Sequence, residues 1–163
     1  ALAALYRAEV PLNSDTVRDG LARVSWPGRF EEIRPSLILD GAHNPHAAKV
    51  LAETWRERFG DRKALLIFSA VAAKDVAGIL RELVPIAAEI FICPVDTPRA
   101  ISVAEIAGEL PEGAPPHRCF ESWIEAFKSA SQDERPILIA GSLFLVGEAR
   151  AHLTSQKFQS STQ

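Results

Sequence analysis

The sequence predicts a Rossmann-like three-layer α/β sandwich, in which helices flank a mostly parallel sheet. Short apolar runs recur along the chain, and most are followed by a segment whose apolar residues repeat at helical spacing. These runs are continuously apolar rather than alternating, as in strands that are covered on both faces. The chain has 163 residues, 47% apolar and 24% charged, which is typical of one globular domain. Ligands are expected at the carboxyl ends of the strands.

Two segments precede the first expected strand. Asn13 to Val24 has the pattern of a short capped helix. Ser25 to Glu32 contains Pro27 and Gly28 and is expected to form a loop. The first strand then covers Leu37 to Leu39.

Helices are expected after the first two strands. On the first helix, apolar residues recur at every fourth position, at Ala47, Leu51, Trp55 and Phe59. Gly60 ends this helix, and Ala64 to Ser69 forms the second strand. The second helix turns four apolar residues inward, Val76, Ile79, Leu80 and Leu83, and Pro85 stops it.

The second half of the chain continues the alternation. Strands are expected at Glu89 to Cys93 and Ile137 to Ala140, with a weaker one near His117 to Phe120. Two helices between them begin with capping boxes, Ser102 with Glu105 and Ser122 with Glu125. The last helix begins after Ser142 and extends to Leu153. The domain therefore spans residues 1–153, and the polar residues 154–163 are expected to fray.

Charge and hydropathy exclude two classes of partner. The formal net charge is −3 and no run of Lys or Arg occurs, so the basic footprint of a nucleic-acid binder is missing. The longest apolar stretches fall far short of the roughly 20 residues that span a bilayer. We therefore expect no nucleic acid and no membrane as partner, and a small molecule as ligand.

The two cysteines and the first residue bear on the cellular compartment of the protein and on whether the chain is part of a longer one. Cys93 and Cys119 are too few and too far apart for a disulfide framework or a zinc site. We expect two reduced, mostly structural thiols in a cytoplasmic protein. The chain begins with Ala1 and contains no Met, so we expect it to be a piece of a longer protein.

One string at the end of the first strand carries the strongest chemical signal. Residues 40–46, DGAHNPH, join this strand to a helix N-terminus, where Pro45 suits the first turn and free amides favour an anion. Asp40 can accept hydrogen bonds from sugar hydroxyls, and His43 can donate to a carboxylate or phosphate. The alternative is that Asp40 and Asn44 only cap the helix while His43 faces solvent.

Five strings together resemble the folylpolyglutamate synthase family of the Mur ligase superfamily. They are WPGR at 26–29, DGAHNP at 40–45, KD at 74–75, TPRA at 97–100 and GSLFLVGE at 141–148. The resemblance covers roughly Leu12 to His152. It implies the C-terminal domain of an ATP-dependent amide ligase that adds L-glutamate to dihydropteroate or reduced folates through an acyl phosphate.

The resemblance also implies roles for four residues. Arg29 looks like the arginine that reaches ATP phosphates, and Asp40 looks like the aspartate that contacts the nucleotide. His43 and Ser142 look like the catalytic pair that positions glutamate. Without the resemblance, Arg29 would be a solvated loop arginine and Ser142 a plain N-cap.

The roles of Lys74, Asp75 and Arg99 stay open. The Lys74-Asp75 pair indicates a helix start with a surface charge, or a substrate contact after a strand. Arg99 could bind a carboxylate through two hydrogen bonds or hold its loop in place.

The phosphate-binding loop is missing from the chain. No Gly-x-x-x-x-Gly-Lys-Ser/Thr string occurs. The family places that loop, the Mg²⁺ ligands, a modified lysine and most of the folate pocket in a preceding ATPase domain. We therefore expect no metal ligands here and no ligase activity from this chain alone. The rival interpretations are a cell-wall Mur-type amino-acid ligase and a non-catalytic α/β module that binds a nucleotide or protein.

Overall fold

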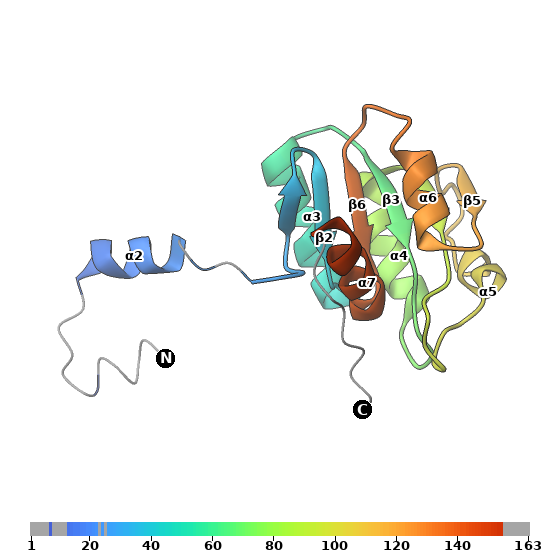
Figure 1. Cartoon of the computed structure of the whole chain (residues 1–163), viewed down its shortest axis with the longest axis horizontal. Helices are drawn as coiled ribbons and strands as arrows, with labels where there is room; N and C mark the ends of the chain where they lie inside the picture. The colour runs from blue at the N-terminus through green and yellow to red at the C-terminus, as the bar shows by residue number, and fades with distance from the viewer. Residues whose placement is uncertain (1–6, 8–12, 23, 25, 155–163) are drawn as a thin grey trace.

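The computed structural model describes residues 7, 13–22, 24 and 26–154. Its centre is a six-stranded sheet in the order β1-β2-β6-β3-β4-β5 (Figure 1). The strands are β1 Glu31–Arg34, β2 Leu37–Asp40, β3 Ala64–Phe68, β4 Ala87–Ile92, β5 His117–Cys119 and β6 Ile137–Ala140. β1 pairs with β2 antiparallel, and every other pairing is parallel.

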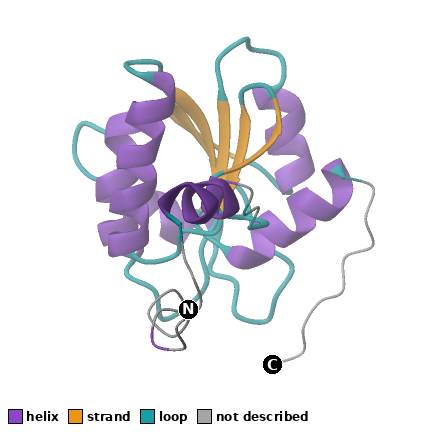
Figure 2. Cartoon of the chain, turned by 90° about the vertical axis from the view of Figure 1, so that its left-hand side faces the viewer, coloured by secondary structure: helices purple, strands orange, loops and turns teal. Residues whose placement is uncertain are grey.

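Helices cover both faces of the sheet (Figure 2). The helices are α2 Ser14–Ala22, α3 Pro45–Phe59, α4 Val76–Leu83, α5 Val103–Gly108, α6 Trp123–Ala130 and α7 Leu143–Leu153, with a 3₁₀ turn η1 at Val84–Ile86. α3, α4 and α5 pack on one face, and α6 and α7 pack on the other. The predicted three-layer α/β fold is therefore confirmed.

Each inner strand feeds two hydrophobic cores, because successive side chains point to opposite faces. Leu66 and Phe68 of β3 face the core under α3 and α4. Leu65 and Ile67 face the core under α6 and α7. All five residues of β3 are buried, so this strand anchors both layers.

The register of the sheet gathers four loops at one edge. Asp40 and Phe68 both pair with Ala140, and Phe68 also pairs with Ile92. The loops that follow β2, β3, β4 and β6 therefore begin side by side. α3, α4 and α7 also begin at this edge, and helix N-termini favour anions.

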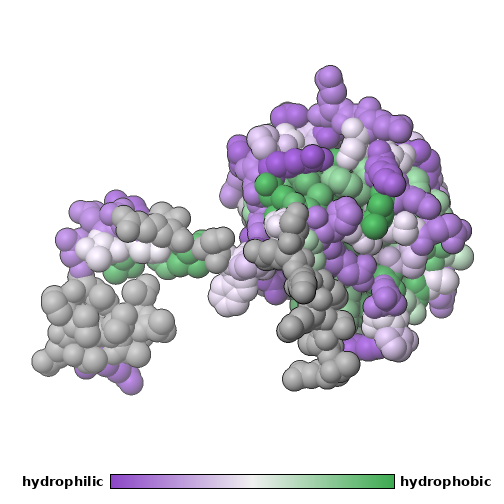
Figure 3. Space-filling view, viewed as in Figure 1, coloured by the Kyte–Doolittle hydropathy of each residue, from purple (hydrophilic) through white to green (hydrophobic). Residues whose placement is uncertain are grey.

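The N-terminal helix is shorter than predicted and stands apart from the sheet (Figure 1). It covers Ser14–Ala22 rather than Asn13 to Val24, and residue 23 lies outside the described residues. Figure 3 shows apolar and polar residues on different sides of it. Leu21, Val24 and Trp26 are 60%, 62% and 71% exposed.

One strand is not predicted by the sequence. The sequence pattern predicts a loop over Ser25 to Glu32, whereas the structure has strand β1 beginning at Glu31. β1 lies at the edge of the sheet and has a single apolar residue, Ile33, so it lacks the continuous apolar run that marks the other strands. Residue 25 itself lies outside the described residues.

The two predicted capping boxes have different outcomes. Ser102 and Glu105 form both reciprocal hydrogen bonds, so the first box is confirmed. At α6 the Ser122 side chain accepts from the Glu125 amide, which is only the serine half of a box. Thr154 is the C-cap of α7, and the rest of the predicted tail, 155–163, lies outside the described residues.

Candidate functional site

The loop between β2 and α3 is fixed by hydrogen bonds within its own string. The Asn44 side chain accepts from the Ala47 amide at 2.9 Å, and Pro45 occupies the first turn of α3. The ring of His43 makes a 2.7 Å hydrogen bond from Nδ1 to the Gly41 carbonyl. Because a carbonyl only accepts, Nδ1 carries the proton and Nε2 is the ring nitrogen left for a ligand.

Asp40 is the last residue of β2 and forms hydrogen bonds to the loops on either side of the β1-β2 pair, at Phe30 and at Ala42. Its carboxylate accepts from the amides of Phe30 and Ala42, both at 2.8 Å. Burial raises the pKa of Asp40, while these two hydrogen bonds and the nearby charge of Arg29 act in the opposite direction. Asn44, and not Asp40, therefore caps α3, and Asp40 holds the Arg29 loop against the strand.

A cavity of about 380 Å³ opens beside Asp40, and we name it the Asp40 pocket. Three predicted site residues, Arg29, Asp40 and His43, line it together. The other lining residues come from the Arg29 loop and α3, namely Phe30, Asn44, Ala47, Val50, Leu51 and Thr54. A carboxylate, an arginine and a helix N-terminus thus face one space.

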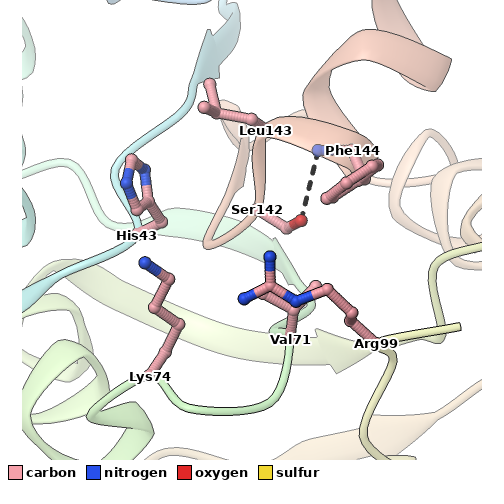
Figure 4. A pocket seen from close by; sticks show the side chains of 7 residues that line it. All are labelled: His43, Val71, Lys74, Arg99, Ser142, Leu143 and Phe144. Carbon is pink, nitrogen blue, oxygen red and sulfur yellow. Dashed lines mark hydrogen bonds between the residues drawn. The ribbon is translucent and has the colours of Figure 1, made fainter. Parts of the chain in front are cut away.

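A second cavity, of about 160 Å³, lies on the other side of His43, and we name it the cationic pocket. Its lining residues are His43, Val71, Lys74, Arg99, Ser142, Leu143 and Phe144. Figure 4 shows the Lys74 ammonium and the Arg99 guanidinium pointing toward the space between His43 and Ser142. The lining contains cationic side chains and no carboxylate, which favours an anionic ligand.

Ser142 enters the cationic pocket from the N-terminus of α7. It is 1% exposed, and its hydroxyl accepts from the Phe144 amide at 3.2 Å. The preceding Gly141 has φ of +103°, and a Cβ there would collide with the Ser69 carbonyl and the Phe68 ring. Ser142 is therefore the N-cap of α7 and also lines the cationic pocket, so its predicted contact with a ligand is compatible with capping.

Lys74 and Arg99 reach the cationic pocket from neighbouring loops. The Ala72 amide donates to the Arg99 carbonyl at 2.8 Å, so the backbone of Arg99 holds the loop after β3. Asp75 caps α4 by accepting from the Gly78 amide at 2.8 Å. Within the described part of the chain, neither Lys74 nor Arg99 forms a salt bridge. Their charges are available to a ligand.

The structure thus divides the four predicted site residues between two pockets. Arg29 and Asp40 line the Asp40 pocket, Ser142 lines the cationic pocket, and His43 lines both. Sequence reasoning left Lys74 and Arg99 open. The available signal was their position after the carboxyl ends of β3 and β4, where parallel sheets place ligands.

The described residues offer neither a metal-binding cluster nor a membrane-spanning helix. Among them, no group of three or more His, Cys, Asp or Glu side chains is arranged to hold a metal ion. No helix in that part of the chain is long and apolar enough to span a bilayer.

Two adjoining pockets lie at the carboxyl ends of the parallel strands, which is where α/β domains of this class bind their ligands. Comparison with known proteins gives the family: residues 28–143 match the family described as "Mur ligase, glutamate ligase domain", and the chain belongs to it.

Individual relatives agree with the predicted resemblance. The chain is 34% identical to folylpolyglutamate synthase of Lacticaseibacillus casei, over 93% of this chain and 35% of that protein. Its fold is similar to Escherichia coli FolC in complex with DHPP and ADP, with a TM-score of 0.82, 27% identity and 94% of this chain covered. A bifunctional folylpolyglutamate synthase/dihydrofolate synthase with Mn, AMPPNP and L-glutamate bound has a TM-score of 0.80 and 33% identity. The match covers 94% of this chain and 38% of that one.

The resemblance to the folylpolyglutamate synthase family is therefore confirmed. The chain spans only about a third of the length of these relatives, which are covered to 35%, 37% and 38%.

Proposed function

We propose that the chain is the C-terminal domain of an ATP-dependent ligase that adds L-glutamate to dihydropteroate, reduced folates or both. The observation that carries the proposal is the pair of pockets that meet at His43. One pocket has the groups for a nucleotide, and the other has the groups for an acidic amino acid. His43 stands where the two substrates would meet.

The Asp40 pocket suits the nucleotide. The oxygens of Asp40 each accept one amide and retain a lone pair for a ribose hydroxyl. Arg29 is exposed at the pocket and can pair with phosphate oxygens, aided by the N-terminus of α3. Relatives are described with ADP and with AMPPNP and Mn, which supports ATP and a divalent metal for the family. We assign the metal, Mg²⁺ in this proposal, to ligands in a preceding ATPase domain.

The cationic pocket suits glutamate. Lys74 and Arg99 provide two positive charges for its carboxylates, and an arginine can bind one of them through two hydrogen bonds. Nε2 of His43 can accept a hydrogen bond from the amino group, because Nδ1 already donates to Gly41. Ser142 lies at a helix N-terminus, which adds further preference for a carboxylate.

The proposed reaction needs alignment more than a protein nucleophile. ATP transfers its γ-phosphoryl group to a free carboxylate of the pteroate or folate acceptor and leaves as ADP. The glutamate amino group then attacks the carbonyl carbon of the acyl phosphate, a C–N bond replaces the C–O bond to phosphate, phosphate leaves, and the nitrogen releases a proton to solvent. Holding the amine and the acyl phosphate in register supplies the rate enhancement that two-substrate reactions gain from proximity. Arg29 supplies charge, while His43 and Ser142 supply alignment.

The partner of this domain in the proposal is the protein's own N-terminal ATPase domain. The relatives are about three times as long as the matched segment. The exposed apolar side chains of Leu21, Val24 and Trp26 precede the family match and could pack against that domain. We place the whole enzyme in the cytoplasm.

The first test is phosphate release by the full-length protein with ATP, Mg²⁺ and glutamate. Dihydropteroate, tetrahydrofolate and a UDP-linked cell-wall precursor are offered in turn. We expect release with a pteroate or folate acceptor, and a loss of about 100-fold in kcat for His43→Ala, the scale of effect that misalignment produces. His46→Ala is the control, since His46 is exposed on α3 and lines neither pocket.

Other outcomes would change the proposal in defined ways. Release with the cell-wall precursor alone would assign the protein to the amino-acid ligases of cell-wall synthesis. No release with any acceptor would favour a non-catalytic module. Equal rates for His43→Ala and His46→Ala would remove His43 from the site.

A further inference from the structure

The Arg29 loop is held in an unusual conformation. Gly28 and Phe30, on either side of Arg29, have φ of +69° and +42°. Positive φ is unfavourable for Phe30, which is not a glycine, and surrounding contacts must maintain it. The exposed Arg29 side chain depends on this backbone for its direction, because no salt bridge to Arg29 is present among the described residues.

One carboxylate holds the loop from the side of β1. Glu31 accepts a 2.7 Å hydrogen bond from the Gly28 amide. The same carboxylate accepts from Nε of Arg150 on α7, at 3.0 Å to each oxygen. The side chains of Glu31 and Arg150 are only 16% and 26% exposed. Solvent therefore screens this ion pair less than the more exposed pair of Glu32 on β1 with Arg58 on α3.

The loop also packs directly on α7. A Cβ at Gly28 would contact Cγ1 of Val146, which shows how closely the backbone approaches this helix. The Gly28 carbonyl accepts from the Gly41 amide at 2.8 Å, which connects the loop to the string that carries His43. The loop is thus fixed at one end by α7 and at the other by β2.

Helix α7 lies beside the cationic pocket and also contacts the Arg29 loop. Ser142, at its N-terminus, lines the cationic pocket, and Arg150 lies eight residues further along, about 12 Å at the helical rise. We propose that Glu31, paired with Arg150, is a positioning residue that sets Arg29 for the nucleotide and ties its loop to the helix that presents Ser142. This inference rests on the proposed function, since it assigns Arg29 to the nucleotide.

The adjacent residue provides a matched control. Glu31→Gln keeps an oxygen that can accept from the Gly28 amide but removes the charge that pairs with Arg150. Glu32→Gln removes the same charge one residue away, where Glu32 pairs with Arg58 of α3 at 3.1 Å in a more exposed position. Arg150→Lys is a second variant, which keeps the charge and loses the two-oxygen contact of Nε.

The kinetic test uses the full-length enzyme. We expect Glu31→Gln to raise KM for ATP about threefold to tenfold, while KM for glutamate stays within about twofold. Arg150→Lys should change KM for ATP in the same direction, and Glu32→Gln should leave both constants unchanged. Equal values for Glu31→Gln and Glu32→Gln, or equal rises in both KM values, would overturn the proposal.

A second measurement separates this inference from the proposed function. In the 163-residue chain, amide exchange at Gly28 and Phe30 should be faster in Glu31→Gln than in Glu32→Gln. If the wild-type full-length protein ligates nothing, the proposed function fails, and the exchange rates still report whether Glu31 holds the loop. Unchanged exchange at both amides would overturn the inference whatever the activity.

Discussion

Glu148 lies half-buried in the middle of α7 and connects this helix to the loop that carries Arg99. Its carboxylate accepts from the Asp96 amide at 3.3 Å. Burial raises the pKa of Glu148, the Asp96 hydrogen bond lowers it, and the charge of Asp96 raises it further. The folded chain therefore favours the protonated carboxyl more than the unfolded chain does.

This pKa shift predicts a pH-dependent stability. The stabilisation from Glu148 is fully present below its ordinary pKa and is lost as pH rises through the raised value. Glu148→Gln keeps an acceptor for Asp96 and does not titrate. The free energy of unfolding of the variant minus that of the wild type should therefore increase as pH rises above the ordinary pKa of a glutamate. Urea unfolding at a series of pH values measures the difference.

The control for this prediction is Glu57→Gln, whose side chain is exposed on α3. A difference for Glu148→Gln that stays flat or falls with pH would contradict the assignment of the shift to burial.

At the scale of elements, the junction between β6 and α7 depends on one glycine. Gly141 combines φ of +103° with backbone and ring atoms that occupy the place of a Cβ. At Gly108, the last residue of α5, a Cβ would meet nothing within 4 Å, and φ is not positive. The same substitution therefore has different consequences at the two glycines.

Replacing each by alanine tests the junction. Gly141→Ala should cost about 1–3 kcal/mol from backbone strain alone, and more from the overlap with Ser69 and Phe68. It should also displace Ser142 and reduce ligation. Gly108→Ala should be neutral or stabilise by about 0.4–1 kcal/mol, because alanine restricts the unfolded chain. Thermal and urea unfolding of both variants decide the matter, and equal destabilisation would refute the steric argument.

The sequence predicted those elements whose signal is local. β2, β3 and β6 are buried on both faces and appear as continuous apolar runs, so pattern alone located them to within a residue or so. β1 was not predicted, because an edge strand with mostly charged residues has no continuous apolar run. Its pairing with β2 depends on tertiary contacts that the sequence does not display.

At the scale of the whole molecule, the sheet register decides which predicted residues meet. The strings predicted Arg29, Asp40, His43 and Ser142 as site residues. Because the ends of β2 and β6 are neighbours, His43 lines one pocket with Arg29 and Asp40 and the other pocket with Ser142. The contribution of Lys74 and Arg99 to the cationic pocket could not be derived, because it depends on how the loops after β3 and β4 fold back. Loop conformation is set by contacts between segments far apart in the chain.

The proposed division of the active site between two domains leads to the last prediction. The 163-residue chain provides two pockets lined by charged side chains, but its sequence has no phosphate-binding loop, and its described residues include no cluster suited to a metal ion. Phosphoryl transfer to a carboxylate needs both functions. We therefore expect no detectable ligation or phosphate release from this chain with ATP, Mg²⁺, glutamate and a pteroate acceptor, whereas the full-length protein turns over under the same conditions.

Cooperative unfolding of the chain, followed by the fluorescence of the buried Trp55 and Trp123, serves as the control that it is folded. A folded chain whose turnover matched the full-length protein would show that these pockets complete the reaction themselves, and would overturn the proposed dependence on an ATPase domain.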